Sequence, residues 1–188
     1  MTEIQNLEMR VSRLEARTEL SELVTHYAIA CDEHDMPKLE SLFTKDACFV
    51  SPNGLMKATG REEIMEMFSK VLAIRGPGYH WTHDHIIRFD RGSLNMASGL
   101  LLSHAETTPD GVQSLAAMKY DDEYQVEDGS WRFAKRTISF LYYVPASEYD
   151  SALTQHNRVV SGDKRLPADY PESLPAWQDF DAKYVTDK

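Results

Sequence analysis

The spacing of apolar residues changes once along this chain, from a helical repeat up to about residue 74 to strand-like segments from about residue 79. We predict helices over residues 3–33 and 61–74, separated by a short helix with Asp35 as its N-cap and Pro37 in its first turn. Gly60 precedes the third helix. The first helix carries apolar residues three and four apart, namely Ile4, Leu7, Val11, Leu14, Leu20, Leu23, Val24, Tyr27 and Cys31.

Four long strands are predicted after the helices, and short loops join them. The strand segments cover residues 79–89, 94–106, 113–127 and 130–144, and a shorter strand at 47–51 precedes a Pro-Asn-Gly turn at 52–54. Turn sequences separate the long strands: Asp90-Arg91-Gly92, Pro109-Asp110-Gly111 and Glu127-Asp128-Gly129. Helices followed by an antiparallel meander indicate an α+β fold rather than alternating βαβ units.

Composition limits the partners of the chain. It has 188 residues, a net charge of −10 and a pI near 5.1, without a dense Lys/Arg cluster. Nucleic acid and anionic membranes are therefore not expected as partners. Neither a signal peptide nor a membrane-spanning stretch is visible, so a cytoplasmic protein is expected. Cys31 and Cys48 lie in apolar surroundings and are interpreted as buried thiols, with a disulfide or a nucleophile as the alternatives.

The segment after about residue 148 differs from the rest of the chain. It contains Pro167, Pro171 and Pro175, with the aromatic residues Tyr170, Trp177 and Phe180 between them. We expect one domain over residues 1–148, of which 1–17 form a helical extension. The tail over 149–188 is expected to pack on the domain or on a neighbouring subunit, over the mouth of a pocket.

The densest group of reactive side chains is the segment 79–85, with three histidines in six residues. On a regular strand His83 and His85 share one face and His80 lies on the other, so one ion could not bind all three rings. His104 could complete only a pair, and no metal site is predicted. Acid–base catalysis by one histidine is the other interpretation, because imidazole titrates near neutral pH.

A catalytic histidine needs a carboxylate that fixes its tautomer and stabilises the imidazolium ion. Asp32 is a candidate, because it ends the apolar sequence Tyr-Ala-Ile-Ala-Cys-Asp. The alternative is that Asp32 only ends the helix and faces solvent.

Two segments of the chain resemble known proteins. Residues 20–50, with Tyr27, Asp32 and Asp35, look like the opening of SnoaL-like proteins in the nuclear transport factor two-like superfamily, and residues 120–136 look like its final hairpin. Over residues 10–145 the chain resembles enzymes of that superfamily: hexachlorocyclohexane dehydrochlorinase, scytalone dehydratase and bile-acid 7α-dehydratase. The resemblance implies a cone of three helices over a strongly curved, mostly antiparallel sheet that encloses an apolar pocket.

The resemblance also assigns roles to individual residues. Asp32 and His80 would form a catalytic dyad, with His83 as the base if the strand register slips. Arg136 would steady a departing anion or an enolate-like oxygen, and Tyr27 would donate a hydrogen bond to the substrate. The residues expected to contact substrate are His83, Trp81, Phe49 and His104.

One position departs from the pattern of the dehydratases, which carry a second polar group on the next strand. The residues of this chain that align best with that polar group, Leu101 and Ala105, are both apolar. A cofactor-independent lyase or isomerase with a single base, acting on a hydrophobic cyclic small molecule, is therefore predicted. A non-catalytic ligand-binding or partner-binding module and a polyketide-cyclase-like aldol catalyst remain alternatives. A homo-oligomer is expected, and the resemblance favours a trimer over a dimer.

Overall fold

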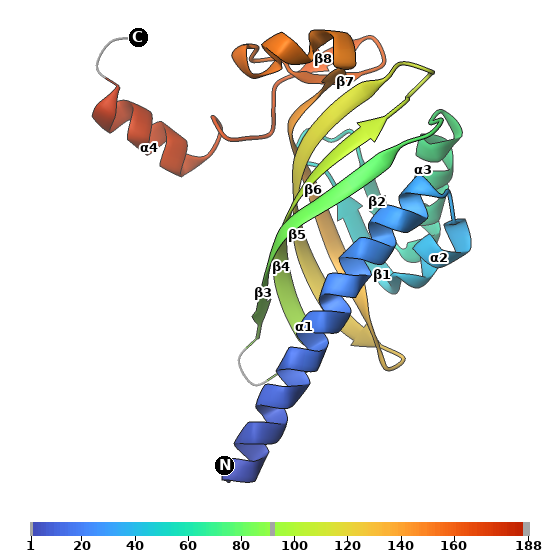
Figure 1. Cartoon of the computed structure of the whole chain (residues 1–188), viewed down its shortest axis with the longest axis vertical. Helices are drawn as coiled ribbons and strands as arrows, with labels where there is room; N and C mark the ends of the chain where they lie inside the picture. Colours follow the sequence, from blue (N-terminus) through green and yellow to red (C-terminus); the bar gives the residue numbers. More distant parts are fainter. Residues whose placement is uncertain (1, 91–92, 186–188) are drawn as a thin grey trace.

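A computed structural model describes residues 2–90 and 93–185 of the chain (Figure 1). The helices are α1 (Glu3–Asp32), α2 (Met36–Ser41), α3 (Arg61–Ala73), the 3-10 helix η1 (Ala146–Thr154) and α4 (Pro175–Tyr184). The strands are β1 (Phe43–Val50), β2 (Lys57–Thr59), β3 (Tyr79–Phe89), β4 (Met96–Thr107), β5 (Ser114–Glu127), β6 (Ser130–Pro145), β7 (Val159–Ser161) and β8 (Lys164–Leu166).

The sheet is mixed and does not close into a barrel. Its order is β2-β1-β6-β5-β4-β3, with β7 beside β6 and β8 beside β7. The antiparallel meander β3–β6 was predicted, and so was the α+β class with its helices packed on a curved sheet (Figure 1). The parallel pairing of β1 with β6 joins residues far apart in the chain. The short strands β2, β7 and β8 were not predicted.

Local sequence explains where several elements begin and end. The Asp35 side chain accepts a hydrogen bond from the Lys38 backbone N–H, as expected for the N-cap of α2. Asp128 and Gly129 both have positive φ angles, the conformation that a two-residue hairpin turn requires between β5 and β6. In the expected turn after β3, Arg91 and Gly92 lie outside the described residues.

An irregularity in β3 changes which histidines share a face. The register between β3 and β4 shifts between Thr82 and His85, whereas the residues on either side pair regularly. His80 opposes buried Ala105, and His85 opposes buried Leu101. The bulge therefore places His80 and His85 on the same inner face, and the alternation expected for a regular strand is wrong here.

A group of aromatic rings joins the helices to the sheet. Tyr27 of α1 packs edge-to-face against Phe43, Phe68 and Phe133, with ring centroids 5.8 to 6.3 Å apart. Each such pair stabilises a fold by about 0.5–1.5 kcal/mol beyond the area that it buries. These contacts fix the last turns of α1 against α3 and the sheet.

A buried ion pair lies next to these rings. Arg136 of β6 donates from Nε and Nη2 to Asp122 of β5, at 2.9 Å in each case, and both side chains are fully buried. The Arg136 guanidinium also lies 4.1 Å from the ring centroid of Tyr27 and 4.0 Å from that of Tyr120. Such a pair compensates for lost hydration only while both partners are present.

The ion pair continues into a chain of hydrogen bonds. The Tyr124 hydroxyl donates to Asp122 Oδ2 at 2.9 Å and lies 3.0 Å from Nε2 of His85. A Cβ atom at Gly99 would lie only 2.8 Å from these two rings, so a glycine is needed there. Burial lowers the pKa of His85, against the opposing effect of the Asp122 charge.

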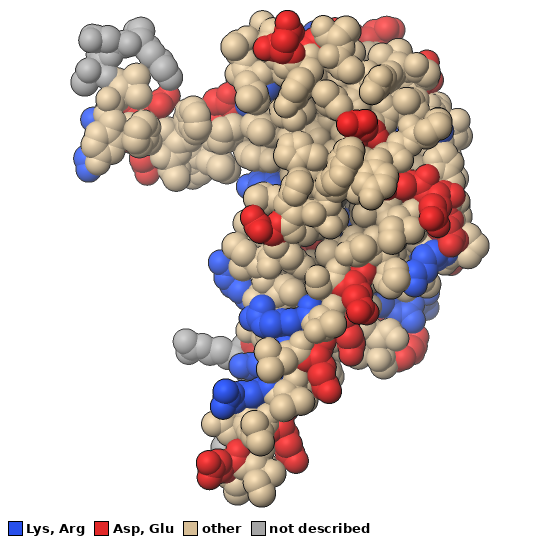
Figure 2. Space-filling model, in the orientation of Figure 1, with Lys and Arg blue, Asp and Glu red and all other residues tan. Residues whose placement is uncertain are grey.

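Both ends of the described chain extend from the domain (Figure 1). The apolar residues of the first turns of α1, Ile4, Leu7, Val11 and Leu14, are exposed, and α4 exposes Trp177 and Phe180. Acidic and basic side chains lie side by side along α1 in Figure 2. Among the described residues, no helix combines the length and apolar character needed to cross a bilayer.

We expect Asp122→Asn to lower the free energy of unfolding by about 3–5 kcal/mol, because it leaves the Arg136 charge buried and unpaired. Denaturant unfolding measures this loss. Asp121→Asn, on the exposed side of the same strand, is the control and should stay within about 0.5 kcal/mol. The double replacement Asp122→Leu with Arg136→Met should recover much of the loss. A fully stable Asp122→Asn variant would contradict the assigned role of the pair.

We also expect stability to fall as pH drops below about 6.5, the ordinary pKa of histidine. Because the folded chain holds His85 at a lower pKa than the unfolded chain, only the unfolded chain takes up this proton at first. The free energy of unfolding, compared between about pH 7.5 and pH 5.5, should change less in His85→Gln than in the wild type. His83→Gln is the exposed-histidine control. An unchanged pH dependence in His85→Gln would contradict this expectation.

Candidate active site

The last residue of α1 and the start of β3 meet through two hydrogen bonds. The His80 backbone N–H donates to Asp32 Oδ2 at 2.9 Å, and His80 Nδ1 lies 2.5 Å from Asp32 Oδ1. Both side chains are largely buried, with 10% of the His80 side chain and 16% of that of Asp32 exposed. Asp32 therefore faces His80 rather than open solvent, and the expected pair is brought together.

This geometry fixes which ring nitrogen of His80 can act as a base. An ionised carboxylate only accepts hydrogen bonds, so Nδ1 carries the proton that Asp32 accepts. The neutral ring then has its lone pair on Nε2. His80 lines a small cavity, the inner chamber, whose volume is about 30 Å³. The ring is thus arranged to accept a proton there.

Hydroxyl and thiol groups surround His80 in the inner chamber. Tyr27, Cys31 and Tyr120 line it. Burial raises the pKa of Cys31 to about 12 and that of Tyr120 to about 12, and burial also raises the pKa of Tyr27. These groups stay protonated near neutral pH. The phenols can donate hydrogen bonds, and Cys31 is a poor nucleophile.

Three of the residues expected to contact substrate lie on the outer face of the sheet. His83 Nε2 lies 2.8 Å from His104 Nδ1, and Trp81 opposes His104 and packs against Tyr79. None of them lines the inner chamber. Their expected contact with substrate is corrected, because the pleat of β3 turns them away from His80.

Phe49 and Arg136 also lie away from the inner chamber. Phe49 is fully buried in the core and packs edge-to-face on Phe68. Arg136 is bound by Asp122 and covered by the ring of Tyr27, and it does not line the inner chamber. Asp122 accepts from Nε and Nη2 of Arg136, and Nη1 makes no hydrogen bond in the part of the chain that the structure describes. This geometry gives the expected action of Arg136 on a departing anion no support.

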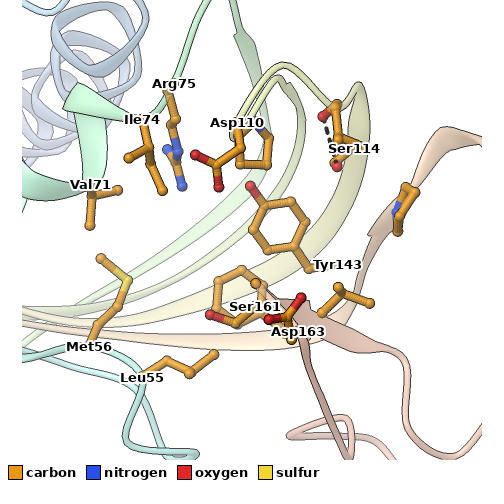
Figure 3. Close-up of a pocket in the computed structure, with 16 residues that line it drawn as sticks. Leu55, Met56, Val71, Ile74, Arg75, Asp110, Ser114, Tyr143, Ser161 and Asp163 are labelled. Atoms are coloured by element: carbon orange, nitrogen blue, oxygen red, sulfur yellow. Dashed lines mark hydrogen bonds between the residues drawn. The ribbon is translucent and has the colours of Figure 1, made fainter.

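A larger cavity of about 400 Å³, the outer chamber, adjoins the inner one (Figure 3). The two share five lining residues, which we call the neck: Met56, Val71, Arg75, Phe140 and Tyr143. Sequence reasoning singled out neither Arg75 nor Tyr143 as a site residue. The preceding Ile74 ends α3, and Arg75 follows the cap as the chain turns toward β3.

The tail builds one wall of the outer chamber, as Ser161 and Asp163 show in Figure 3. Asp169 fixes this segment to the domain: its carboxylate accepts from the Phe140 backbone N–H at 2.8 Å and from Asn53 Nδ2 at 3.2 Å. The short segment from Val160 to Asp163 thus lines the chamber, whereas α4 of the same tail extends from the domain (Figure 1).

Across residues 2–90 and 93–185, no three His, Cys, Asp or Glu side chains form a group that could hold a metal ion. The inner chamber instead offers one imidazole, one guanidinium and several hydroxyl groups. This set can move protons and donate hydrogen bonds to a ligand.

Comparisons with known proteins agree with this architecture. The profile of the SnoaL-like domain matches residues 12–137. A gamma-hexachlorocyclohexane dehydrochlorinase from Sphingobium indicum is 28% identical over 142 residues, covering 72% of this chain and 86% of the relative.

Solved structures show the same fold. A type 3 hexachlorocyclohexane dehydrochlorinase from Novosphingobium barchaimii has a TM-score of 0.66 at 21% identity, covering 73% of this chain and 94% of its own. A protein proposed as a scytalone dehydratase, from Novosphingobium aromaticivorans, has a TM-score of 0.66 at 19% identity, covering 72% and 91% of the two chains.

Proposed function

Because the chain belongs to the SnoaL-like domain family, we propose that it is a cofactor-independent lyase or isomerase acting on a hydrophobic cyclic small molecule. The observation that carries the proposal is the double hydrogen bond from His80 to Asp32 beside an internal cavity. If Asp32 had only a structural role, its carboxylate would need to do no more than end α1. This one orients an imidazole whose second nitrogen is left for a ligand.

In the proposed reaction His80 Nε2 removes a proton from carbon, and Asp32 stabilises the imidazolium ion that forms. Tyr27 donates a hydrogen bond to the substrate from the wall of the inner chamber. General acid–base catalysis contributes about 10²–10⁴-fold, so the shape and fixed dipoles of the chamber must supply the rest.

An elimination is the favoured reaction type. The curated relative is named as a dehydrochlorinase, and one similar structure is described as a proposed scytalone dehydratase. Both names describe loss of a small group together with a proton. One base suffices when the imidazolium returns its proton to the departing group or to water. The apolar side chains of both chambers, such as Phe140 and Val71, suit a hydrophobic ring.

We expect His80→Gln and Asp32→Asn each to lower turnover by about 10²–10⁴-fold while the fold is retained. The wild type is first screened with cyclic alcohols, enones and halides in D2O, and NMR detects deuterium uptake or loss of water or halide. His83→Gln and Asp84→Asn are the matched controls, because both residues are exposed on the same strand.

Full turnover in Asp32→Asn would overturn the dyad. If the wild type bound a ligand but showed neither turnover nor exchange with any of the three compound classes, a non-catalytic binding module would be favoured.

We further propose a cytoplasmic homo-oligomer, with a trimer favoured. The free thiols Cys31 and Cys48 are consistent with a reducing compartment. The exposed rings of Tyr79 and Trp81 on the outer face of the sheet offer apolar area for a subunit contact. Light scattering should give about three times the mass of the 21.5 kDa chain. Replacing Trp81 by Glu should lower that mass, and a monomeric wild type would refute the proposal.

A further inference from the structure

We propose that Arg75 is a second catalytic residue, which binds the carbonyl oxygen of an uncharged cyclic ketone or aldehyde and stabilises the enolate that forms when His80 removes a proton. This inference rests on the proposed function and narrows its substrate class. It transfers to Arg75 the role that the sequence had assigned to Arg136.

The position of Arg75 is set by its backbone. Its N–H donates to the Leu72 carbonyl at 3.0 Å, which holds it at the end of α3, and an isolated β-bridge pairs it with Pro109. The side chain starts between α3 and β3 and lines both the inner and the outer chamber. A ligand that passes from one chamber to the other must pass this side chain.

The guanidinium of Arg75 is free to bind a ligand. Within the part of the chain that the structure describes, it makes no side-chain hydrogen bond and no ion pair, although the residue is partly buried. Arg136, by contrast, donates from Nε and Nη2 to Asp122 at 2.9 Å, and although its Nη1 makes no hydrogen bond to any described residue, it lines neither chamber. A partly buried guanidinium without a partner is costly unless a ligand or water binds it.

The charge of Arg75 reaches the walls of the inner chamber. Burial raises the pKa of Cys31 and of Tyr120, and the Arg75 charge opposes the rise in both cases. Both residues line the inner chamber together with His80. An oxygen atom between Arg75 and these phenol and thiol groups would therefore lie in a positive potential.

The other charges select an uncharged ligand over an anion. Asp110 and Asp163 line the outer chamber, and Figure 3 shows the side chains of Arg75 and Asp110 pointing toward one another. Among the described residues that line the inner chamber there is no carboxylate. A ligand that already carries a negative charge would be repelled at the entrance. A carbonyl becomes negative only in the transition state, where Arg75 stabilises it.

The volumes of the two chambers indicate which part of the substrate each chamber can hold. A cavity needs about 10–15 Å³ on the same measure to hold one water molecule, so the inner chamber of about 30 Å³ holds a small group but not a whole ring. The outer chamber, at about 400 Å³, is within the range of small-molecule sites. The ring therefore lies in the outer chamber, and its carbonyl and the adjacent carbon enter the neck.

The step balances without a further reactant. His80 Nε2 takes the proton from the carbon next to the carbonyl, the C–H electron pair forms the enolate double bond, and the carbonyl π pair moves to the oxygen that Arg75 binds. Collapse of the enolate forms the conjugated double bond and expels the β-substituent with its bonding pair. The imidazolium then protonates the departing hydroxide to give water, or protonates the enolate carbon in an isomerisation.

The test measures hydrogen–deuterium exchange of 2-tetralone in D2O by NMR, after subtraction of the spontaneous rate. Arg75→Met keeps the apolar stem of the side chain and removes the guanidinium with its charge. We expect it to lower kcat about 10²–10³-fold, the usual effect of losing one oxyanion donor, with a smaller change in KM. Arg75→Lys should restore part of the rate. Circular dichroism checks that the variants are folded.

Arg88→Met is the matched control, because Arg88 is exposed on β3 and lines neither chamber. We expect it to leave the exchange rate within about twofold of the wild type. If Arg75 served only a structural role, Arg75→Met would lower the free energy of unfolding without changing the exchange rate of the folded protein.

Wild-type exchange that Arg75→Met leaves unchanged, but that His80→Gln abolishes, would overturn this inference and leave the proposed function intact. Exchange that neither variant affects would refute both. Tighter binding of tetralin-2-carboxylate than of 2-tetralone, abolished by Arg75→Met, would show a preformed anion as the ligand and would overturn the assignment to an uncharged carbonyl.

Discussion

The two hydrogen bonds between Asp32 and His80 are the contact on which the rest of the candidate site depends. They connect the last residue of α1 to the second residue of β3, and they leave one imidazole nitrogen for a ligand. A carboxylate at the end of a helix is unfavourable next to the negative end of the helix dipole. Asp32 is stabilised there by His80, so the local preference is broken where the proposed chemistry takes place.

The two arginines near the site differ because of what surrounds them. Arg136 lies among aromatic rings with Asp122, and its charge is compensated within the core. Arg75 lies at the neck between two cavities and keeps its charge available. A buried guanidinium requires a carboxylate that compensates its charge, whereas a guanidinium that borders a cavity can bind a ligand there. The Arg136–Asp122 pair thus stabilises the fold, while the Arg75 guanidinium at the neck remains available to bind a ligand.

The outer chamber combines a family domain with a segment outside the region that defines it. The family match covers residues 12–137, whereas part of the chamber wall comes from Val160 to Asp163. Asp169 holds this segment against β6 through the Phe140 backbone and against the turn at Asn53. The inner chamber belongs mainly to the family fold, and the tail shapes the space where the body of a ligand would lie.

Residue patterns along the chain were enough to predict the local features: three helices, the four-stranded meander, the cap at Asp35 and the turn at Asp128. The sequence also indicated Asp32 and His80, through their residue types and the resemblance of their surroundings. Three features required the folded chain: the bulge that separates His83 from His85, the binding of Arg136 by Asp122 and the placement of Arg75 and Tyr143 at the neck. Periodicity and capping depend on neighbours a few residues apart, whereas these features depend on strand register and burial between distant segments.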